Sequence, residues 1–528
     1  MIAFLFALFY QRFLGLFFDT RKAAAARDTQ SRFARLPAEQ VAALRSRMDP
    51  YPPPRRLKKP LGGKDLEGWQ LKDYENGRQV WHKQGSPTSK NKGRDNRSGG
   101  RSQSEAEKHF LGLLPKKVRS SPASSAAAAA VHGAAFLRRV QIPASGHLGN
   151  DYGGPMFLLP GILIALYAGG KREGELLPEP QQAEMRRYLR NQQNADGGWG
   201  ISTVAPSGLF GSCLSYIALR LLGVAADDDA LVDARAFIHA NGGPTAAPQW
   251  AKFWMSVLNV FSWEGVTPFT PELWIMPRWV PFHPWRFWCH CRMVYLPMAY
   301  CYGARFAVPE TQFIRDLRDE LYPSTTPYGA TRFRDTWFDT SELDRYEPTS
   351  AVLRASFFVL GLYEYVAPTF LRNRAQSWLL QLMAVEDMST HYIDIGPVNK
   401  AMNMVCALAA YGPRSQQYQS HEERVGDYLW LAADGMKMQG YNGSQLWDTA
   451  FAVQATVSVL RATKGRDDLD LEPARAFVRD AYDFVDRMQV RDNVPNGEYY
   501  YRHKSKGAWP FSTAEHGWPI SDCSSEGL

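Results

Sequence analysis

The sequence predicts an all-α fold. Apolar residues gather in runs of helical length at residues 156–167, 211–222, 250–261, 352–366, 398–410 and 449–461. Glycine and proline punctuate the chain between these runs. The alternation of apolar and polar residues that is typical of half-buried strands is scarce. A chain of 528 residues is long enough for two or three domains with a sizeable core.

The composition favours aromatic packing over nucleic-acid binding. Aromatic side chains make up 13% of the chain, and their rings supply large buried areas and electron-rich faces that attract cations. The net charge is +8, and much of the basic clustering lies early, between Arg55 and Lys117. That distribution suits a solvated or membrane-facing segment. Because no recognition motif accompanies it, we expect no nucleic-acid partner.

The cysteines predict a reduced compartment and no metal. All six are scattered, mostly in apolar contexts. Cys289-His290-Cys291 together with Cys301 resembles a zinc ligand set, but alternating neighbours do not easily close one tetrahedral site. No phosphate-binding glycine loop is present. We therefore expect neither a metal nor an organic cofactor.

The N-terminal segment, residues 1–105, is expected to differ from the rest. Residues 1–18 are mostly apolar but include Gln11 and Arg12, so they fall short of the roughly 20 apolar residues of a spanning helix. They fit an interfacial anchor, an extension packed on the protein or an artefact of gene prediction. Residues 85–105 are rich in Ser, Gly, Asn, Lys and Arg and predict a disordered insertion or long loop.

An internal repeat suggests how the helices are arranged. One copy has a glutamine followed by Gly-x-Trp at a fixed spacing, and a second copy is split by a loop; their residues are Tyr188, Leu189, Gln193, Gly197 and Trp199, and Phe484, Val485, Gln489, Gly507 and Trp509. A glutamine amide can satisfy orphan backbone groups at a helix terminus. A chance Gly-Gly-Trp turn is the alternative, but the full spacing is met once and half-met again. The pattern resembles the QW motif of triterpene cyclases.

Longer stretches carry a more specific resemblance. They lie at residues 151–157, 288–297, 390–399 and 434–449, and are followed by an Asp-Cys-x-x-Glu motif at residues 522–526. In this order they resemble the oxidosqualene cyclases, in particular their lanosterol-forming branch. The resemblance implies an α/α toroid, a double α/α barrel with QW repeats. It places the inserted barrel at residues 106–387 and the first part of the catalytic barrel at residues 388–528, so that the second barrel is expected to be incomplete.

The resemblance also assigns an acid. Asp522 would protonate the epoxide of the substrate, Cys523 would hydrogen-bond to that acid, and Glu526 would return the proton through water. An acid in a dry pocket stays neutral, and hydrogen bonds tune its acidity. The alternative for the motif alone is a carboxylate at a helix start.

The remaining site residues follow by position in the motifs. Trp447 and Phe511 resemble aromatic walls that stabilise a carbocation, and Tyr152 resembles the tyrosine that presses on the folding substrate. His290 resembles a histidine near the final deprotonation. Cys291 and Tyr295 resemble the constriction of the substrate channel. Core packing is the alternative for each residue taken singly.

The implied function is cyclisation of (S)-2,3-epoxysqualene to a tetracyclic triterpene alcohol, most simply lanosterol. Because this substrate is very apolar, the resemblance implies a monotopic enzyme on the cytosolic face of the endoplasmic reticulum membrane or a lipid droplet. Residues 266–288, dense in tryptophan and proline, are a candidate membrane contact. Two alternatives stay open: a catalytically inactive truncated paralogue, and a protein prenyltransferase-like toroid, which would need zinc.

Overall fold

The computed structural model describes residues 66–85, 102–114 and 123–528. The predicted anchor at residues 1–18 and most of the predicted insertion at 85–105 lie outside them. The described chain forms two compact units. Unit 1 comprises Asn194–Leu214 and Leu231–Leu379, and unit 2 the described residues of Lys58–Gln193, Ser215–Ala230 and Leu380–Leu528. The predicted division into an inserted barrel at 106–387 and the first part of a catalytic barrel at 388–528 stays a prediction.

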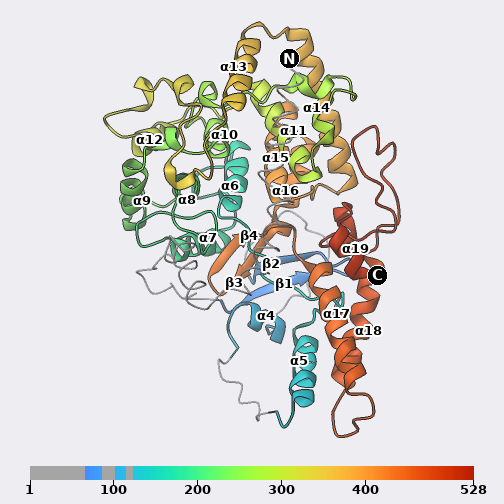
Figure 1. The fold of residues 1–528 in the computed structure, drawn as a ribbon. Coiled ribbons are helices and arrows are strands. Elements are labelled where there is room, and N and C mark those ends of the chain that lie inside the picture. The colour runs from blue at the N-terminus through green and yellow to red at the C-terminus, as the bar shows by residue number, and fades with distance from the viewer. Residues whose placement is uncertain (1–65, 86–101, 115–122) are drawn as a thin grey trace, which may run out of the picture. The chain divides into compact units, whose positions relative to one another are not determined.

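Helices dominate both units, as predicted (Figure 1). Each of the six predicted apolar runs overlaps a helix. In chain order the α-helices are α4 (Glu105–Phe110), α5 (Ala126–Val140), α6 (Leu158–Ala168), α7 (Glu179–Gln192), α8 (Leu209–Leu221), α9 (Asp229–Ala240), α10 (Gln249–Val257), α11 (Cys289–Ala304), α12 (Gln312–Leu321), α13 (Ala351–Val366), α14 (Thr369–Ser389), α15 (Pro397–Tyr411), α16 (Gln416–Glu423), α17 (Gln445–Ala462), α18 (Glu472–Arg487) and α19 (Ser521–Gly527).

Local sequence explains where several helices begin. The Ser104 hydroxyl accepts a hydrogen bond from the Glu107 amide, and the Glu107 carboxylate accepts one from the Ser104 amide, which makes a capping box on α4. The hydroxyl of Ser125 caps α5 in the same way by accepting from Ala128. Pro397 opens α15, where its missing amide proton costs nothing.

Two small antiparallel hairpins in unit 2 were not predicted. Strands β1 (Trp69–Asp73) and β2 (Gln79–Lys83) pair with Leu71 opposite Trp81. Strands β3 (Leu429–Ala432) and β4 (Gly435–Met438) form the second hairpin. The ring of Trp81 meets that of Trp430 edge-on, with centroids 5.6 Å apart, so the hairpins share a core.

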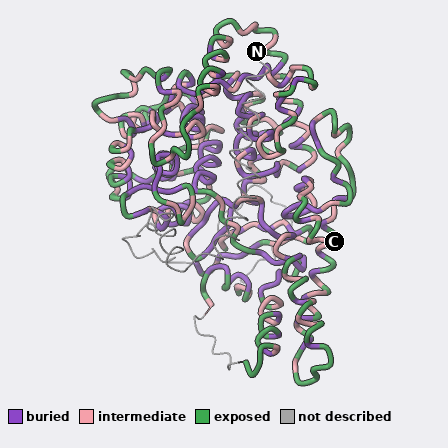
Figure 2. Tube along the Cα trace, in the orientation of Figure 1, coloured by how far each residue is buried: buried purple, intermediate pink, exposed green. Residues whose placement is uncertain are grey.

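Unit 2 buries its helices unequally (Figure 2). Helix α6 is buried along nearly its whole length and packs against α15. Helices α17 and α18 lie side by side, with α5 against both and α19 against α17. This group of helices positions the predicted acid motif.

Unit 1 contains the proline-rich segment predicted at residues 266–288. It forms no regular α-helix or strand, because proline cannot continue either one. Short 3₁₀ turns lie at Pro271–Ile275 and Pro284–Arg286 instead. In this segment Trp274 is buried, whereas the side chain of Trp279 is 77% exposed.

Among the described residues, no single helix is long and apolar enough to cross a membrane. Helices α13 and α14 meet the length and composition criteria only as a pair, bent by 111°. Helix α13 nevertheless exposes large apolar side chains, namely Phe358, Val359, Leu362, Tyr365 and Val366.

Candidate active site

The predicted acid lies in the first turn of α19. Asp522 is exposed, and its carboxylate accepts a hydrogen bond from the Ser521 hydroxyl at 3.5 Å. Two hydrogen bonds to the backbone of Trp509 hold this helix in place. The Ile520 amide donates to the Trp509 carbonyl at 3.0 Å, and the Trp509 amide donates to Ser524 Oγ at 3.0 Å. The helix that carries Asp522 is therefore hydrogen-bonded to the segment that contains Trp509.

Cys523 points away from the acid. Successive helical side chains diverge by about 100°, and the thiol of Cys523 is completely buried among Leu446, Phe484, Met488, Trp509 and Phe511. Burial raises the pKa of Cys523 to about 12, and the charges of Asp522 and Glu526 add to the effect. The group therefore stays a neutral thiol. No Cys523 bond to the Asp522 carboxylate is present in the described chain, so its predicted role as hydrogen-bond partner stays a prediction.

Glu526 shares the face of Asp522. Residues four apart on a helix are neighbours on its surface, so the two carboxylates lie one turn apart. Gln454 of α17 donates its side-chain amide to the Glu526 carboxylate at 2.6 Å and thereby fixes it. This arrangement suits the predicted exchange of a proton between the two carboxylates.

Aromatic rings form a stack beside α19, which we call the aromatic stack: Trp447, Phe511, Tyr441 and Tyr152. Phe511 lies nearly parallel to Trp447 at 5.4 Å and to Tyr441 at 4.7 Å between centroids. Tyr152 approaches Phe511 at 5.0 Å. The structure thus brings together three predicted residues and adds Tyr441. Its place within the quoted motif at 434–449, six residues before Trp447, was the signal that could have identified it.

Asp448 is a second acidic residue near the stack that was not predicted. Asn150 donates to its carboxylate at 3.0 Å, and the hydroxyl of Ser444 donates to the same oxygen. Burial raises the pKa of Asp448, against the opposing effect of these two donors. Burial raises the pKa of the Tyr152 phenol and the charge of Asp448 adds to this, so Tyr152 stays neutral at physiological pH.

The split repeat closes through backbone and indole hydrogen bonds. The indole N–H of Trp509 donates to the Val485 carbonyl in the last turn of α18, at 2.8 Å. Gln489 donates to the Gly507 carbonyl at 3.0 Å. In this copy the tryptophan indole, rather than the glutamine, is a second donor to the Val485 carbonyl, which also accepts from the Met488 amide at 3.2 Å. In the other copy Gln193 donates to the Ala230 carbonyl at 2.8 Å.

His290, Cys291 and Tyr295 lie in unit 1, at the start of α11. The His290 ring lies 4.4 Å from that of Trp288, and burial lowers the pKa of His290 to about 4, so the ring is neutral at pH 7. Burial raises the pKa of Tyr295 to about 12, and its ring lies among those of Trp250, Phe269 and Phe287. These residues form one group and the α19 residues another, in different units.

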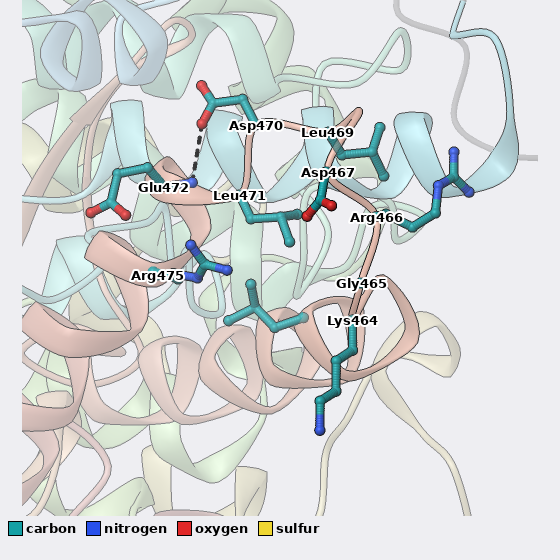
Figure 3. Close-up of a pocket in the computed structure, with 10 residues that line it drawn as sticks. Lys464, Gly465, Arg466, Asp467, Leu469, Asp470, Leu471, Glu472 and Arg475 are labelled. Atoms are coloured by element: carbon teal, nitrogen blue, oxygen red, sulfur yellow. Dashed lines mark hydrogen bonds between the residues drawn. The ribbon is translucent and has the colours of Figure 1, made fainter.

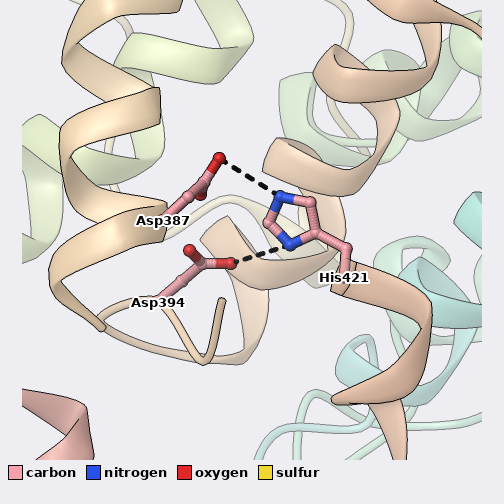
Figure 4. Close-up of side chains that lie close together, drawn as sticks. All are labelled: Asp387, Asp394 and His421. Carbon is pink, nitrogen blue, oxygen red and sulfur yellow. Dashed lines mark ion pairs between the residues drawn. The ribbon is translucent and has the colours of Figure 1, made fainter. Parts of the chain in front are cut away.

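The cysteines of α11 do not form one metal site. Cys289 and Cys301 lie 12 positions apart on the same helix, which separates their backbones by about 18 Å. The metal-ligating side chains that come together in the described chain are instead Asp387, Asp394 and His421, all buried in unit 2 (Figure 4). Lys400 Nζ donates to His421 Nδ1 at 3.0 Å. An ammonium group thus supplies the positive charge that a metal would bring.

These residues and Glu386 form a charged cluster, comprising Glu386, Asp387, Asp394, Lys400 and His421. Burial raises the pKa of Glu386 to about 8, and the charge of Asp394 adds to this. Burial also raises the pKa of Asp394 to about 7 and lowers that of Lys400 to about 8. The cluster holds the turn between α14 and α15, since Lys400 donates to the Tyr392 carbonyl at 2.7 Å.

A pocket of about 390 Å³ lies at the connection of α17 to α18 (Figure 3). Its lining is mostly charged and includes Lys464, Arg466, Asp467, Asp470 and Arg475. None of the predicted site residues contributes to it. Such a charged surface hollow does not suit an apolar substrate.

Known proteins share much of this chain. Residues 175–433 match the squalene-hopene cyclase N-terminal domain. The chain is 45% identical over 394 residues to a cycloartenol synthase of Dictyostelium discoideum, covering 74% of this chain and 54% of that protein. It is 41% identical over 472 residues to a lanosterol synthase of Mus musculus, covering 88% and 60%. A lanosterol synthase of Aspergillus fumigatus is 40% identical over 484 residues, covering 88% and 61%.

The chain therefore spans between 54% and 61% of the length of these three relatives. The similarity agrees with the mostly helical fold. By the matched domain and these identities, the chain belongs to the family of the squalene–hopene and oxidosqualene cyclases.

Proposed function

We propose that this chain takes part in the cyclisation of (S)-2,3-epoxysqualene to a tetracyclic triterpene alcohol, with lanosterol as the product. The observation that carries the proposal is that α19, the helix with Asp522, packs through Cys523 beside the aromatic stack. An acid starts the reaction by protonating the epoxide oxygen, and aromatic faces stabilise positive charge without forming a bond to it.

Each residue of the α19 group has a part in this proposal. Asp522 transfers its proton to the epoxide, the C–O bond breaks, and the cation forms where the first ring closes. The substrate covers the exposed carboxyl face and excludes water from the reacting atoms. Glu526, one turn along, returns a proton to Asp522. The neutral Cys523 thiol lies behind the stack, where it does not trap the cation.

His290 has its part at the end of the reaction. A neutral imidazole accepts a proton, and burial keeps this ring neutral at physiological pH. We propose that it lies near the carbon from which the last proton leaves. Cys291 and Tyr295, on the same helix α11, would line the passage by which the substrate enters.

The identity of the product distinguishes a lanosterol-forming chain from other members of the family. Relatives named as lanosterol synthases and as a cycloartenol synthase match the chain to a similar degree. Incubation of the purified chain with oxidosqualene in detergent, followed by mass spectrometry of the products, identifies the alcohol formed. We expect lanosterol from the wild type.

The same assay tests the acid. Asp522→Asn should abolish product, because an amide cannot protonate an epoxide. Asp468→Asn, at an exposed aspartate that pairs with Arg466, should leave the rate unchanged. A folded wild-type chain that forms no cyclic alcohol would contradict the proposal. That result would favour the second candidate, an inactive paralogue of the family.

We also propose that the chain binds the surface of the endoplasmic reticulum membrane or of lipid droplets, from the cytosolic side. The exposed apolar side chains of α13, together with Trp279 and Phe370, support this, since such a patch is unusual on a soluble surface. Flotation with phosphatidylcholine vesicles should retain the chain at high salt. The double substitution Phe358→Ser and Leu362→Ser should release it, whereas Val204→Ser, at an isolated exposed valine, should not.

A further inference from the structure

The loop that carries α19 is fastened at two buried points to the end of α14 and the turn that follows it. His516 Nε2 donates to the Ile395 carbonyl at 2.9 Å. Arg502 Nη1 donates to the Ser389 hydroxyl at 2.6 Å. The side chain of His516 is completely buried and that of Arg502 nearly so. Because a carbonyl can only accept, the His516 ring carries its proton on Nε2.

The receiving turn is itself held rigidly. Glu386 of the charged cluster accepts a hydrogen bond from the Ile395 amide at 2.9 Å. The hydroxyl of Tyr428 donates to the Ile393 carbonyl at 3.0 Å. Positive φ angles at three non-glycine residues of this turn are kept only because the surroundings fix them. The charged cluster therefore provides a firm attachment for the loop.

His516 lies six positions before the acid, and Arg502 contacts the segment between them although it lies twenty positions before the acid. The Arg502 guanidinium lies 3.7 Å over the ring of Trp518, and it also reaches the Gly517 carbonyl at 3.5 Å. His516 meets the Tyr441 ring edge-on at 5.4 Å, so it touches the aromatic stack as well as the turn. Helix α19 has seven residues, and so short a helix depends on its neighbours for its position.

We infer that His516 and Arg502 are positioning residues that hold α19, and with it the carboxyl group of Asp522, in register with the aromatic stack. The inference rests on the proposed function only where it calls Asp522 the acid. The attachment of α19 itself is a statement about structure and can be measured without any activity.

The thiol of Cys523 reports on that attachment. It is completely buried under α19, as Cys406 is nearly so in α15 of the same unit. Alkylation of the full chain by N-ethylmaleimide, resolved by peptide mass spectrometry, gives the ratio of the two labelling rates. His516→Phe keeps a ring but loses the hydrogen-bond donor, and Arg502→Met loses the guanidinium donors and the charge. Each should raise the Cys523:Cys406 ratio about tenfold, the effect of one lost buried hydrogen bond on a local opening.

Two further variants make the test specific. His516→Gln retains a side-chain N–H and should keep the wild-type ratio. Tyr418→Phe removes a hydrogen bond to the buried Ala165 carbonyl elsewhere in unit 2 and should also leave the ratio unchanged. An unchanged ratio in both His516→Phe and Arg502→Met would overturn the inference. So would equal acceleration at both cysteines, since that indicates general loosening.

Kinetic measurements distinguish a positioning role of His516 in the reaction from a purely structural role. With oxidosqualene as substrate, His516→Phe should lower kcat at least tenfold with KM within about twofold, and His516→Gln should restore kcat. A change confined to KM would contradict a positioning role. If the wild type forms no product, the proposed function fails, whereas the labelling ratio still decides whether these residues hold α19.

Discussion

The charged cluster makes an unusual prediction about Glu386. Glu386→Gln should be tolerated at neutral pH, because a buried carboxyl with a pKa of about 8 is mostly protonated at pH 7. A glutamine has nearly the shape of that neutral acid. Its side-chain oxygen can still accept from the Ile395 amide and from Asn399, as the Glu386 oxygen does. The substitution should therefore matter more as the pH rises.

The sign follows from the direction of the shift. The pKa of Glu386 is raised above its ordinary value of 4.5, so its stabilising protonation is complete at low pH and is lost as pH rises through the folded pKa. From pH 7 to pH 9 the folded chain would lose roughly one proton at this site, while the unfolded chain is already ionised. This costs the wild type about 1 kcal/mol of unfolding free energy over that window. The Glu386→Gln variant does not lose this unfolding free energy, because its side chain does not titrate.

The measurement is the thermal midpoint of each protein at pH 7 and pH 9. Between pH 7 and pH 9 the thermal midpoint of Glu386→Gln should rise by about 2–4 °C relative to that of the wild type. The titration of Asp394 and Lys400 cancels in this comparison because both proteins contain these residues. Glu515→Gln is the control. Burial alone would raise the pKa of Glu515, but the hydrogen bond and charge of Arg424 lower it overall, so it is ionised at both values. The reasoning would be refuted if the thermal midpoint of Glu386→Gln rose relative to the wild type only as much as that of the control, or if it fell.

Three further predictions concern the support of the site. Trp509→Phe should remove one of the two donors to the Val485 carbonyl at the end of α18, where the Met488 amide still donates, at a cost of about 0.5–1.5 kcal/mol; hydrogen exchange should accelerate in the last turn of α18 and not in α15. Gly517→Ala should lower the thermal midpoint, because φ is +67° there and the new methyl group would lie 2.8 Å from the Ser389 carbonyl oxygen; an unchanged midpoint would contradict this. Lys400→Met should cost about 3–5 kcal/mol by leaving buried carboxylates uncompensated, and adding Asp394→Asn should recover part of that loss in the same melting assay.

The helices and the acid segment were predictable because their signals are local. An apolar run of helical length identifies α6 or α15 without knowledge of its neighbours. The hairpin of β3 and β4 was missed for a physical reason. Every residue of β3 and β4 is buried on both faces, so these strands lack the alternation that half-buried strands show.

The charged cluster was also beyond sequence reasoning. Glu386 and Lys400 lie on helices that look ordinary in sequence. Only the folded chain shows that both are buried and that Lys400 meets His421 from a third helix. A buried charge is recognisable by its partners, and these partners lie up to 35 positions apart. The same holds for His516, whose partner Ile395 is 121 positions away.

The Asp-Cys-x-x-Glu motif shows how a helix rearranges what a sequence places side by side. Asp522 and Cys523 are neighbours in sequence, yet one is exposed and the other is completely buried. Asp522 and Glu526 are four residues apart, and the helix sets them on one face. The pair that can exchange a proton is therefore the distant one. The adjacent cysteine seals the apolar side of the helix and keeps a neutral sulfur against the aromatic stack. A substitution at residue 523 should consequently disturb the packing of α19 first, and should affect the position of Asp522 only through that packing.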